Sequence, residues 1–238
     1  MRRSVVTMIG ACVLTLLGLA AARPGEEASP DLSALLGIQI DAQAHRLTID
    51  GTICLDQGIL EYLAVVTGGK EYESVLALNC KAAGLHAALL LIGGEPGDLD
   101  PRYREDAPTL PESLKLTGRQ GARFNITVRW KDGDAVREVP ATQLLLSRQS
   151  DAPPPAMPWV FTGSYFIKDL ETGKELYMAR LDGTLAAVYY DPAAILNLPA
   201  AEGNPYRGEK TGFTLNTHVA PPRGTRIQAI FELAPPAE

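Results

Sequence analysis

Four polar side chains in the first half of the sequence have the chemistry of a binding or acid–base site. They are Glu61, Lys70, Glu73 and His86. Carboxylate, ammonium and imidazole groups bind polar ligands and transfer protons. Glu61 is the most unusual, because a carboxylate inside an apolar strand must be solvated, paired or functional. For all four residues, an ordinary solvated or packed side chain is the alternative to a site.

Recognised catalytic and metal-binding motifs are absent from the sequence. It contains no His-x-x-x-His, no Cys-x-x-Cys, no phosphate-binding glycine loop and no Gly-x-Ser-x-Gly. We therefore predict no metal site and no cofactor, and favour a non-catalytic protein over an enzyme. An iron–sulfur cluster is excluded because it needs about four ligands.

Two predicted strands would position the first three of these residues. The apolar run 59–66 is followed by Gly68-Gly69 and then by a second strand, 71–78. A glycine pair tolerates the positive φ of a two-residue turn, so the pattern predicts a hairpin. Its register places Glu61 and Lys70 on one face and Glu73 on the other.

A helix over residues 80–92 would position His86. Asn79 is the predicted N-cap, and Gly93-Gly94 would end the helix. One stripe of this helix is apolar, and His86 lies one position from it. The apolar positions of the stripe are Ala82, Leu85, Leu89 and Ile92.

The remaining pattern is dominated by short strands. Residues 123–130 alternate between apolar and polar, and a turn with Gly133 predicts a hairpin with residues 135–140. We predict an α+β fold: mainly antiparallel β, one packed amphipathic helix and long proline-rich connections. The predicted domain covers 38–233 and consists of one unit or of two lobes. These lobes would be 38–150 and 159–233, joined by the proline-rich spacer 151–158.

The first 22 residues have the layout of a secretory signal peptide. Two arginines precede an apolar run that ends in Ala20-Ala21-Ala22, which predicts cleavage after Ala22 and a flexible leader over 23–37. The protein is therefore expected to be exported, to the periplasm or the extracellular space. Membrane anchoring is the alternative, through an uncleaved segment or through lipidation at Cys12 in "IGAC".

Export would place Cys54 and Cys80 in an oxidising compartment. A disulfide between them and two separately buried thiols are both open at this point. The net charge of −6 excludes nucleic acid as a partner, since such binding needs a basic face.

The stretch "GGKEYESVLALNCKAAGLHAALLLIGGEPG", Gly68 to Gly97, resembles the YdjY-like domain of bacterial exported proteins and lipoproteins. The segments "WVFTGSYF", "GTLAAVYYDPAAILNLP" and "PPRGT" are also similar, so the resemblance spans Ile38 to Leu233. Tyr72 stands where that family's Lys-x-His-Glu segment has its histidine. The resemblance implies an exported domain of a family without an established activity.

These observations favour a non-catalytic binding or scaffold module of the bacterial cell envelope, with an unknown envelope protein as its partner. The alternative is a small-ligand or metal-binding domain that uses residues 61–86, and a hydrolase of unknown substrate is the second alternative. Convergence of Glu73 and His86 in one cleft would favour a site.

Overall fold

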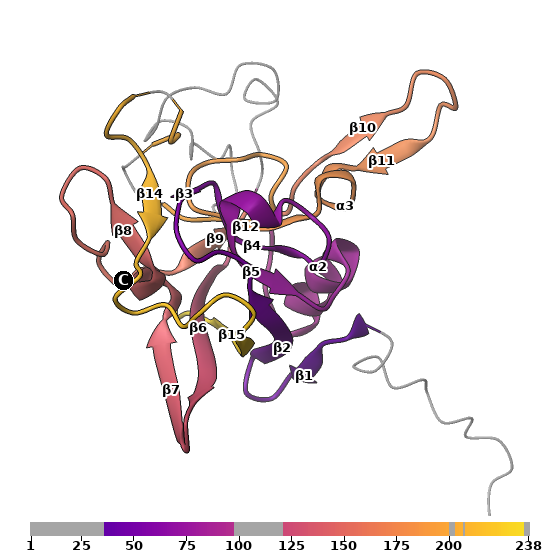
Figure 1. Cartoon of the computed structure of the whole chain (residues 1–238). Coiled ribbons are helices and arrows are strands. Elements are labelled where there is room, and N and C mark those ends of the chain that lie inside the picture. Colours follow the sequence, from indigo (N-terminus) through magenta and orange to yellow (C-terminus); the bar gives the residue numbers. More distant parts are fainter. Residues whose placement is uncertain (1–35, 98–120, 200–202, 207, 236–238) are drawn as a thin grey trace, which may run out of the picture. The chain divides into compact units, whose positions relative to one another are not determined.

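The computed structural model describes residues 36–97, 121–199, 203–206 and 208–235 (Figure 1). The predicted signal peptide, nearly all of the leader and Cys12 lie outside these residues, so export, processing and lipidation stay predictions. In the part that is described, no helix is long and apolar enough to cross a membrane.

The centre of the fold is a closed barrel of eight β-strands. Each strand pairs with the next around the ring, and the pairing of the last strand, β5, with the first, β2, closes it. In ring order the strands are β2 (Arg46–Ile53), β15 (Arg226–Leu233), β6 (Arg123–Asp132), β9 (Trp159–Phe161), β13 (Leu196–Asn197), β12 (Thr184–Ala187), β4 (Tyr62–Val66) and β5 (Ser74–Leu78).

Alternating side chains of the long strands fill the interior. In β6, Phe124, Ile126, Val128 and Trp130 are buried, whereas the residues between them are exposed or half-buried. A strand with one face on the core has this pattern. The predicted hairpin is confirmed, because β7 (Ala135–Pro140) pairs antiparallel with β6. A second antiparallel partner, β1 (Gln39–Asp41), extends the sheet beyond β2.

Strands from both sides of the spacer 151–158 contribute to the barrel. Four of them precede the spacer and four follow it. Trp130 and Trp159, one from each side, belong to the same hydrophobic core. The segments 38–150 and 159–233 therefore share one core.

The predicted α+β class is wrong, because the closed barrel dominates and the helices are short. The two α-helices of the described part are α2 (Ala82–Leu91) and α3 (Met178–Asp182). A helix does lie within 80–92, but it is not amphipathic: Leu90 and Leu91 are 46% and 51% exposed. Its N-cap is Lys81 rather than Asn79, whose Oδ1 instead accepts a hydrogen bond from the hydroxyl of Thr67.

The predicted hairpin at Gly68-Gly69 is also wrong, because β4 and β5 are parallel. The glycines do form a turn, and Gly68 has a φ of 83°. The chain then runs back through the 3-10 helix η1 (Glu71–Glu73), so that Glu61 N–H donates to the carbonyl of Glu73 beside the start of β5. Both strands are almost fully buried, as is typical of parallel pairing. Their residues therefore lack the alternation of apolar and polar side chains by which a hairpin is recognised.

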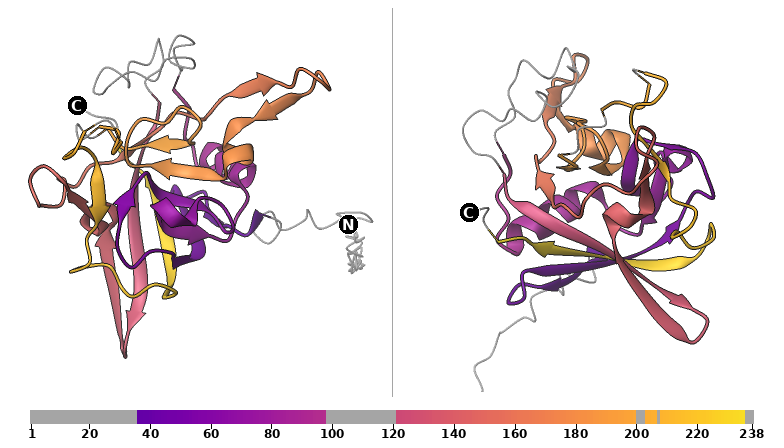
Figure 2. Two further views of the ribbon diagram at one scale, coloured as in Figure 1. Left: turned by 45° about the horizontal axis from the view of Figure 1, so that its top comes forward. Right: turned by 90° about the vertical axis from the view of Figure 1, so that its left-hand side faces the viewer.

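Two small sheets lie outside the barrel. One contains β3 (Ile59–Leu60), β14 (Phe213–Leu215) and β8 (Leu145–Ser147), which follows the 3-10 helix η4 (Ala141–Leu144). The other is a two-stranded arm, β10 (Phe166–Lys168) and β11 (Glu175–Tyr177), which extends away from the barrel (Figure 2). Strand β11 ends at Tyr177, where α3 begins.

Candidate binding groove

The four predicted site residues do not form one site. Glu61, Lys70 and Glu73 lie near one another: burial and the nearby Glu73 raise the pKa of Glu61, and Lys70 acts to lower the pKa of both carboxyl groups. Lys70 also contacts Tyr62. His86 instead contacts Tyr177, on the arm. Glu73 and His86 thus do not converge in one cleft, and the predicted set divides into two clusters.

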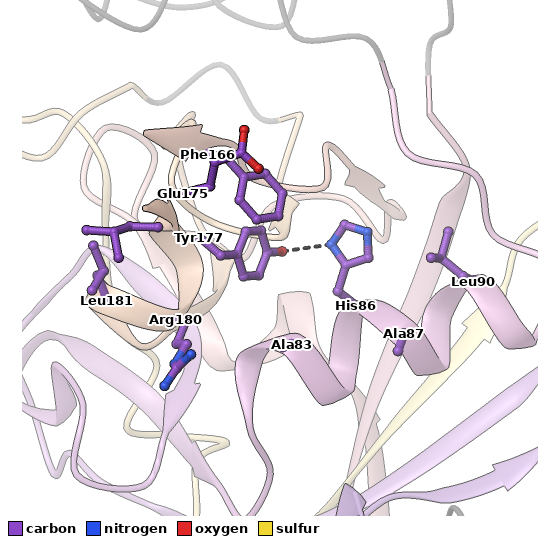
Figure 3. A pocket seen from close by; sticks show the side chains of 10 residues that line it. Ala83, His86, Ala87, Leu90, Phe166, Glu175, Tyr177, Arg180 and Leu181 are labelled. Atoms are coloured by element: carbon purple, nitrogen blue, oxygen red, sulfur yellow. Dashed lines mark hydrogen bonds between the residues drawn. The ribbon is translucent and has the colours of Figure 1, made fainter. Parts of the chain in front are cut away.

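The His86 cluster lies in a groove of about 550 Å³ between α2, the arm and α3, here called the α2 groove (Figure 3). Helix α2 contributes Ala83, His86, Ala87 and Leu90, and the arm contributes Phe166, Glu175, Leu176 and Tyr177. Helix α3 adds Arg180 and Leu181. Most of these side chains are apolar, and the two charged residues are exposed.

Two apolar faces of α2 explain why this helix is not amphipathic. Residues such as Leu85 and Leu89 pack into the core. Residues 83, 86, 87 and 90 follow the helical i, i+3, i+4, i+7 spacing and form a second face, which lines the groove. A helix that uses two faces in this way needs apolar side chains nearly all round.

A tight corner after β9 fixes the base of the arm. Gly163 and Ser164 have φ values of 83° and 61°, and the second is unusual for a residue with a side chain. The Ser164 hydroxyl donates to the carbonyl of Ala193 at 2.7 Å and accepts from the N–H of Ala179 at 3.1 Å. One serine thus ties the arm to α3 and to the segment before β13.

His86 and Tyr177 form the polar base of the groove. His86 Nδ1 lies 2.7 Å from the Tyr177 hydroxyl, which donates to the carbonyl of Gly163 at 2.9 Å. Burial lowers the pKa of His86 and raises that of Tyr177, so both groups favour their neutral forms.

Aromatic rings enclose this pair. Phe161 of β9 meets the His86 ring edge-on, with ring centroids 5.0 Å apart. Phe166 lies over Tyr177 at the same centroid distance and is itself 56% exposed. Phe166, Leu90 and Leu181 are exposed and line the same groove, so they form an apolar surface that is open to solvent. Such a surface on a small domain commonly marks a site of interaction.

The second cluster is a hydrogen-bonded network centred on Tyr62, here called the Tyr62 network. Lys70 Nζ donates to the Tyr62 hydroxyl at 3.2 Å, and this hydroxyl donates to Asp191 Oδ2 at 3.0 Å. Burial raises the pKa of Asp191, and it also raises the pKa of Glu61 and Glu73, on which Lys70 acts in the opposite direction.

The Tyr62 network continues from Asp191 to the corner of the groove. The N–H of Asp191 donates to Asn197 Oδ1 at 2.7 Å, and Asn197 Nδ2 donates to Thr162 Oγ1 at 2.7 Å. Thr162 and Asn197 are buried, and Tyr62 is only 1% exposed. This network is therefore a satisfied structural element that joins β4 to the base of the arm, rather than an open site.

The two cysteines form no disulfide. Cys54 is buried, and its thiol donates to the carbonyl of Ser74 at 3.1 Å. Cys80 is half-buried, and burial raises the pKa of each thiol to about 12. The disulfide alternative is thus not found, and neither thiol is activated as a nucleophile. In the described ranges no three His, Cys, Asp or Glu side chains are placed to hold a metal ion.

Sequence reasoning missed Tyr177, Gly163 and Tyr62. Tyr177 is 91 residues from His86, and no local pattern relates the two. The pair Gly163-Ser164 could have indicated the corner, because a Gly-Ser pair between two apolar runs is typical of a turn.

The fold and the groove define a class of protein: a closed β-barrel domain with a lateral apolar groove and a histidine–tyrosine pair at its base. The family model of the YdjY domain matches residues 38–232, and the chain belongs to this family. The resemblance seen in the sequence is thereby confirmed. No match was found among curated proteins or among solved structures.

Proposed function

We propose that the protein is a non-catalytic binding module of the bacterial cell envelope, and that it holds a small apolar molecule in the α2 groove. The observation that carries the proposal is this groove, walled by apolar side chains of α2 and the arm. Its volume of about 550 Å³ falls in the range of small-molecule sites, roughly 300–1,000 Å³.

Burial of exposed apolar surface supplies the driving force. Phe166, Leu90 and Leu181 are each about half exposed, and a ligand between them would remove that surface from water. Among the described residues that line the groove there is no serine or cysteine for the imidazole to activate as a nucleophile. Export rests on the signal-like residues 1–22 of the sequence.

The proposal is tested by thermal unfolding with 1-methoxynaphthalene as an apolar probe. At ten times its Kd, a ligand of the folded state stabilises by about 1.4 kcal/mol, which corresponds to a Tm rise of about 3–6 °C. The variant Ala87→Phe fills the groove from α2 and should abolish this rise. Leu91→Phe places the same ring on an exposed position of α2 outside the groove and should keep it.

An equal rise in wild type and Ala87→Phe would show that the probe binds elsewhere and would contradict the assignment of the groove. A stable wild-type protein with no rise would contradict the binding of small apolar molecules and would favour a protein partner.

A further inference from the structure

The Tyr177 hydroxyl has a single proton, and it contacts Gly163, His86 and the Ser164 side chain, whose own proton goes to Ala193. The carbonyl oxygen of Gly163, 2.9 Å away, can only accept a hydrogen bond. The Tyr177 proton therefore points to Gly163. His86 Nδ1, 2.7 Å from the same hydroxyl, must then be the donor in its own contact with Tyr177. Tyr177 thus fixes the proton of the neutral imidazole on Nδ1.

This tautomer leaves His86 Nε2 with a lone pair and no proton. In the described part of the chain, the side-chain hydrogen bond of the His86 ring runs through Nδ1 to Tyr177, and the backbone of Gly163 also bonds to the ring. Figure 3 shows the ring standing on α2 within the groove, with its second nitrogen on the side away from Tyr177. The groove therefore offers a bound molecule the acceptor atom Nε2 between apolar side chains, besides the exposed carboxylate of Glu175.

From this geometry we propose that His86 Nε2 accepts a hydrogen bond from the hydroxyl group of the ligand. The inference rests on the proposed function, and it names the ligand class: neutral apolar hydroxyl compounds, such as phenols and long-chain alcohols. Ethers and hydrocarbons of the same shape lack the donor. A carboxylate would present lone pairs to the lone pair of Nε2.

The charged residues of the groove do not compete for this nitrogen. Glu175 and Arg180 are both exposed, and the Arg180 side chain points away from the imidazole (Figure 3). Tyr177 and Phe161 occupy the other sides of the ring. Burial lowers the pKa of His86, so the acceptor form is the dominant one at neutral pH.

Two matched probes test the inference: 1-naphthol, which carries the donor, and 1-methoxynaphthalene, which does not. Their Kd values for the purified wild-type protein are measured by calorimetry at neutral pH. One net hydrogen bond predicts a preference of about fivefold for 1-naphthol. His86→Leu keeps an apolar groove and should reduce the ratio of the two Kd values to about one.

Tyr177→Phe tests the role of the hydroxyl as a positioning group. This variant keeps the ring and lets the imidazole proton move to Nε2, which should bring the ratio of the two Kd values toward one. Nitrogen NMR of the wild-type imidazoles should show Nδ1 protonated and Nε2 unprotonated, with His86 assigned among the three histidines by its absence in His86→Leu.

The outcomes separate the inference from the proposed function. Equal affinity of wild type for both probes, or a proton on Nε2, overturns the hydroxyl preference and leaves the apolar groove standing. A preference that survives in His86→Leu assigns the acceptor to another group and also overturns the inference. Binding of neither probe overturns the inference and the proposed function together.

Discussion

Two tyrosine hydroxyls organise the polar side chains of this protein. Tyr177 holds His86 at the base of the α2 groove, and Tyr62 joins Lys70 to Asp191 in the Tyr62 network. The environments of the two differ in access to solvent. Tyr62 is buried, whereas His86 and Tyr177 are half-buried and line the groove. Of the two hydroxyl groups, that of Tyr177 therefore lies at the groove, and that of Tyr62 does not.

Glu61 gives a prediction at this scale. Burial and the nearby Glu73 raise its pKa above the ordinary value of 4.5, against the opposing effect of Lys70. The folded state therefore binds this proton more tightly than the unfolded state. The resulting stability is present below the unfolded pKa and is lost as the pH rises through the folded pKa. Glu61→Gln should thus raise the Tm at pH 7 and change it little at pH 4.

Thermal unfolding of wild type and Glu61→Gln between pH 4 and pH 8 checks this expectation. Glu171→Gln, which removes an exposed carboxylate in the turn of the arm, serves as the control for the loss of one acidic side chain. A Tm of Glu61→Gln below that of wild type at pH 7 would mean that ionised Glu61 stabilises the fold.

At the scale of elements, the corner 162–164 connects the groove to the barrel. Thr162 ends the hydrogen-bonded path from the Tyr62 network, Gly163 accepts from Tyr177, and Ser164 holds α3. A Cβ atom on Gly163 would lie 2.8 Å from Pro96 Cβ and 3.4 Å from His86 Cε1. Glycine is therefore required here both by its positive φ and by the space around it.

Gly163→Ala is expected to be more destabilising than Gly133→Ala. Gly133 also has a positive φ, but nothing lies within 4 Å of its Cβ position, so alanine there should cost about 1–2 kcal/mol from the backbone alone. Crowding at Gly163 should add about 1–3 kcal/mol. Chemical denaturation of the two variants measures the difference, and equal losses would show that the corner adjusts freely.

At the scale of the whole described unit, barrel closure links distant segments of the sequence. The pairing of β2 with β5 completes a ring in which β9, β13 and β12 come from beyond the spacer 151–158. Neither side of the spacer can complete this ring without the other. We therefore expect one cooperative unfolding transition.

The two tryptophans provide the measurement, because Trp130 and Trp159 lie on opposite sides of the spacer in sequence and are both buried. Trp130→Phe leaves a reporter only in β9, and Trp159→Phe leaves one only in β6. Within each variant, the fluorescence midpoint should coincide with the midpoint from circular dichroism. Separate midpoints would indicate two independently stable lobes.

The sequence predicted those strands whose own residues alternate between apolar and polar side chains. Strand β6 was predicted correctly because its alternation reflects one buried face. Strands β4 and β5 are buried on both faces, so nothing in their residues distinguished parallel from antiparallel pairing. Likewise, His86 was found as a candidate, but its partner Tyr177 depends on how the arm returns to α2.

The way in which the arm joins the rest of the chain has a consequence for protein engineering. Its two ends meet where the N–H of Met178 donates to the carbonyl of Tyr165 at 2.9 Å. Leu170, in the turn at its far end, is 98% exposed and does not support the core. Hairpins of other lengths and sequences can therefore replace the arm between the same two anchor points. Such a replacement would change the specificity of the groove and leave the barrel unchanged.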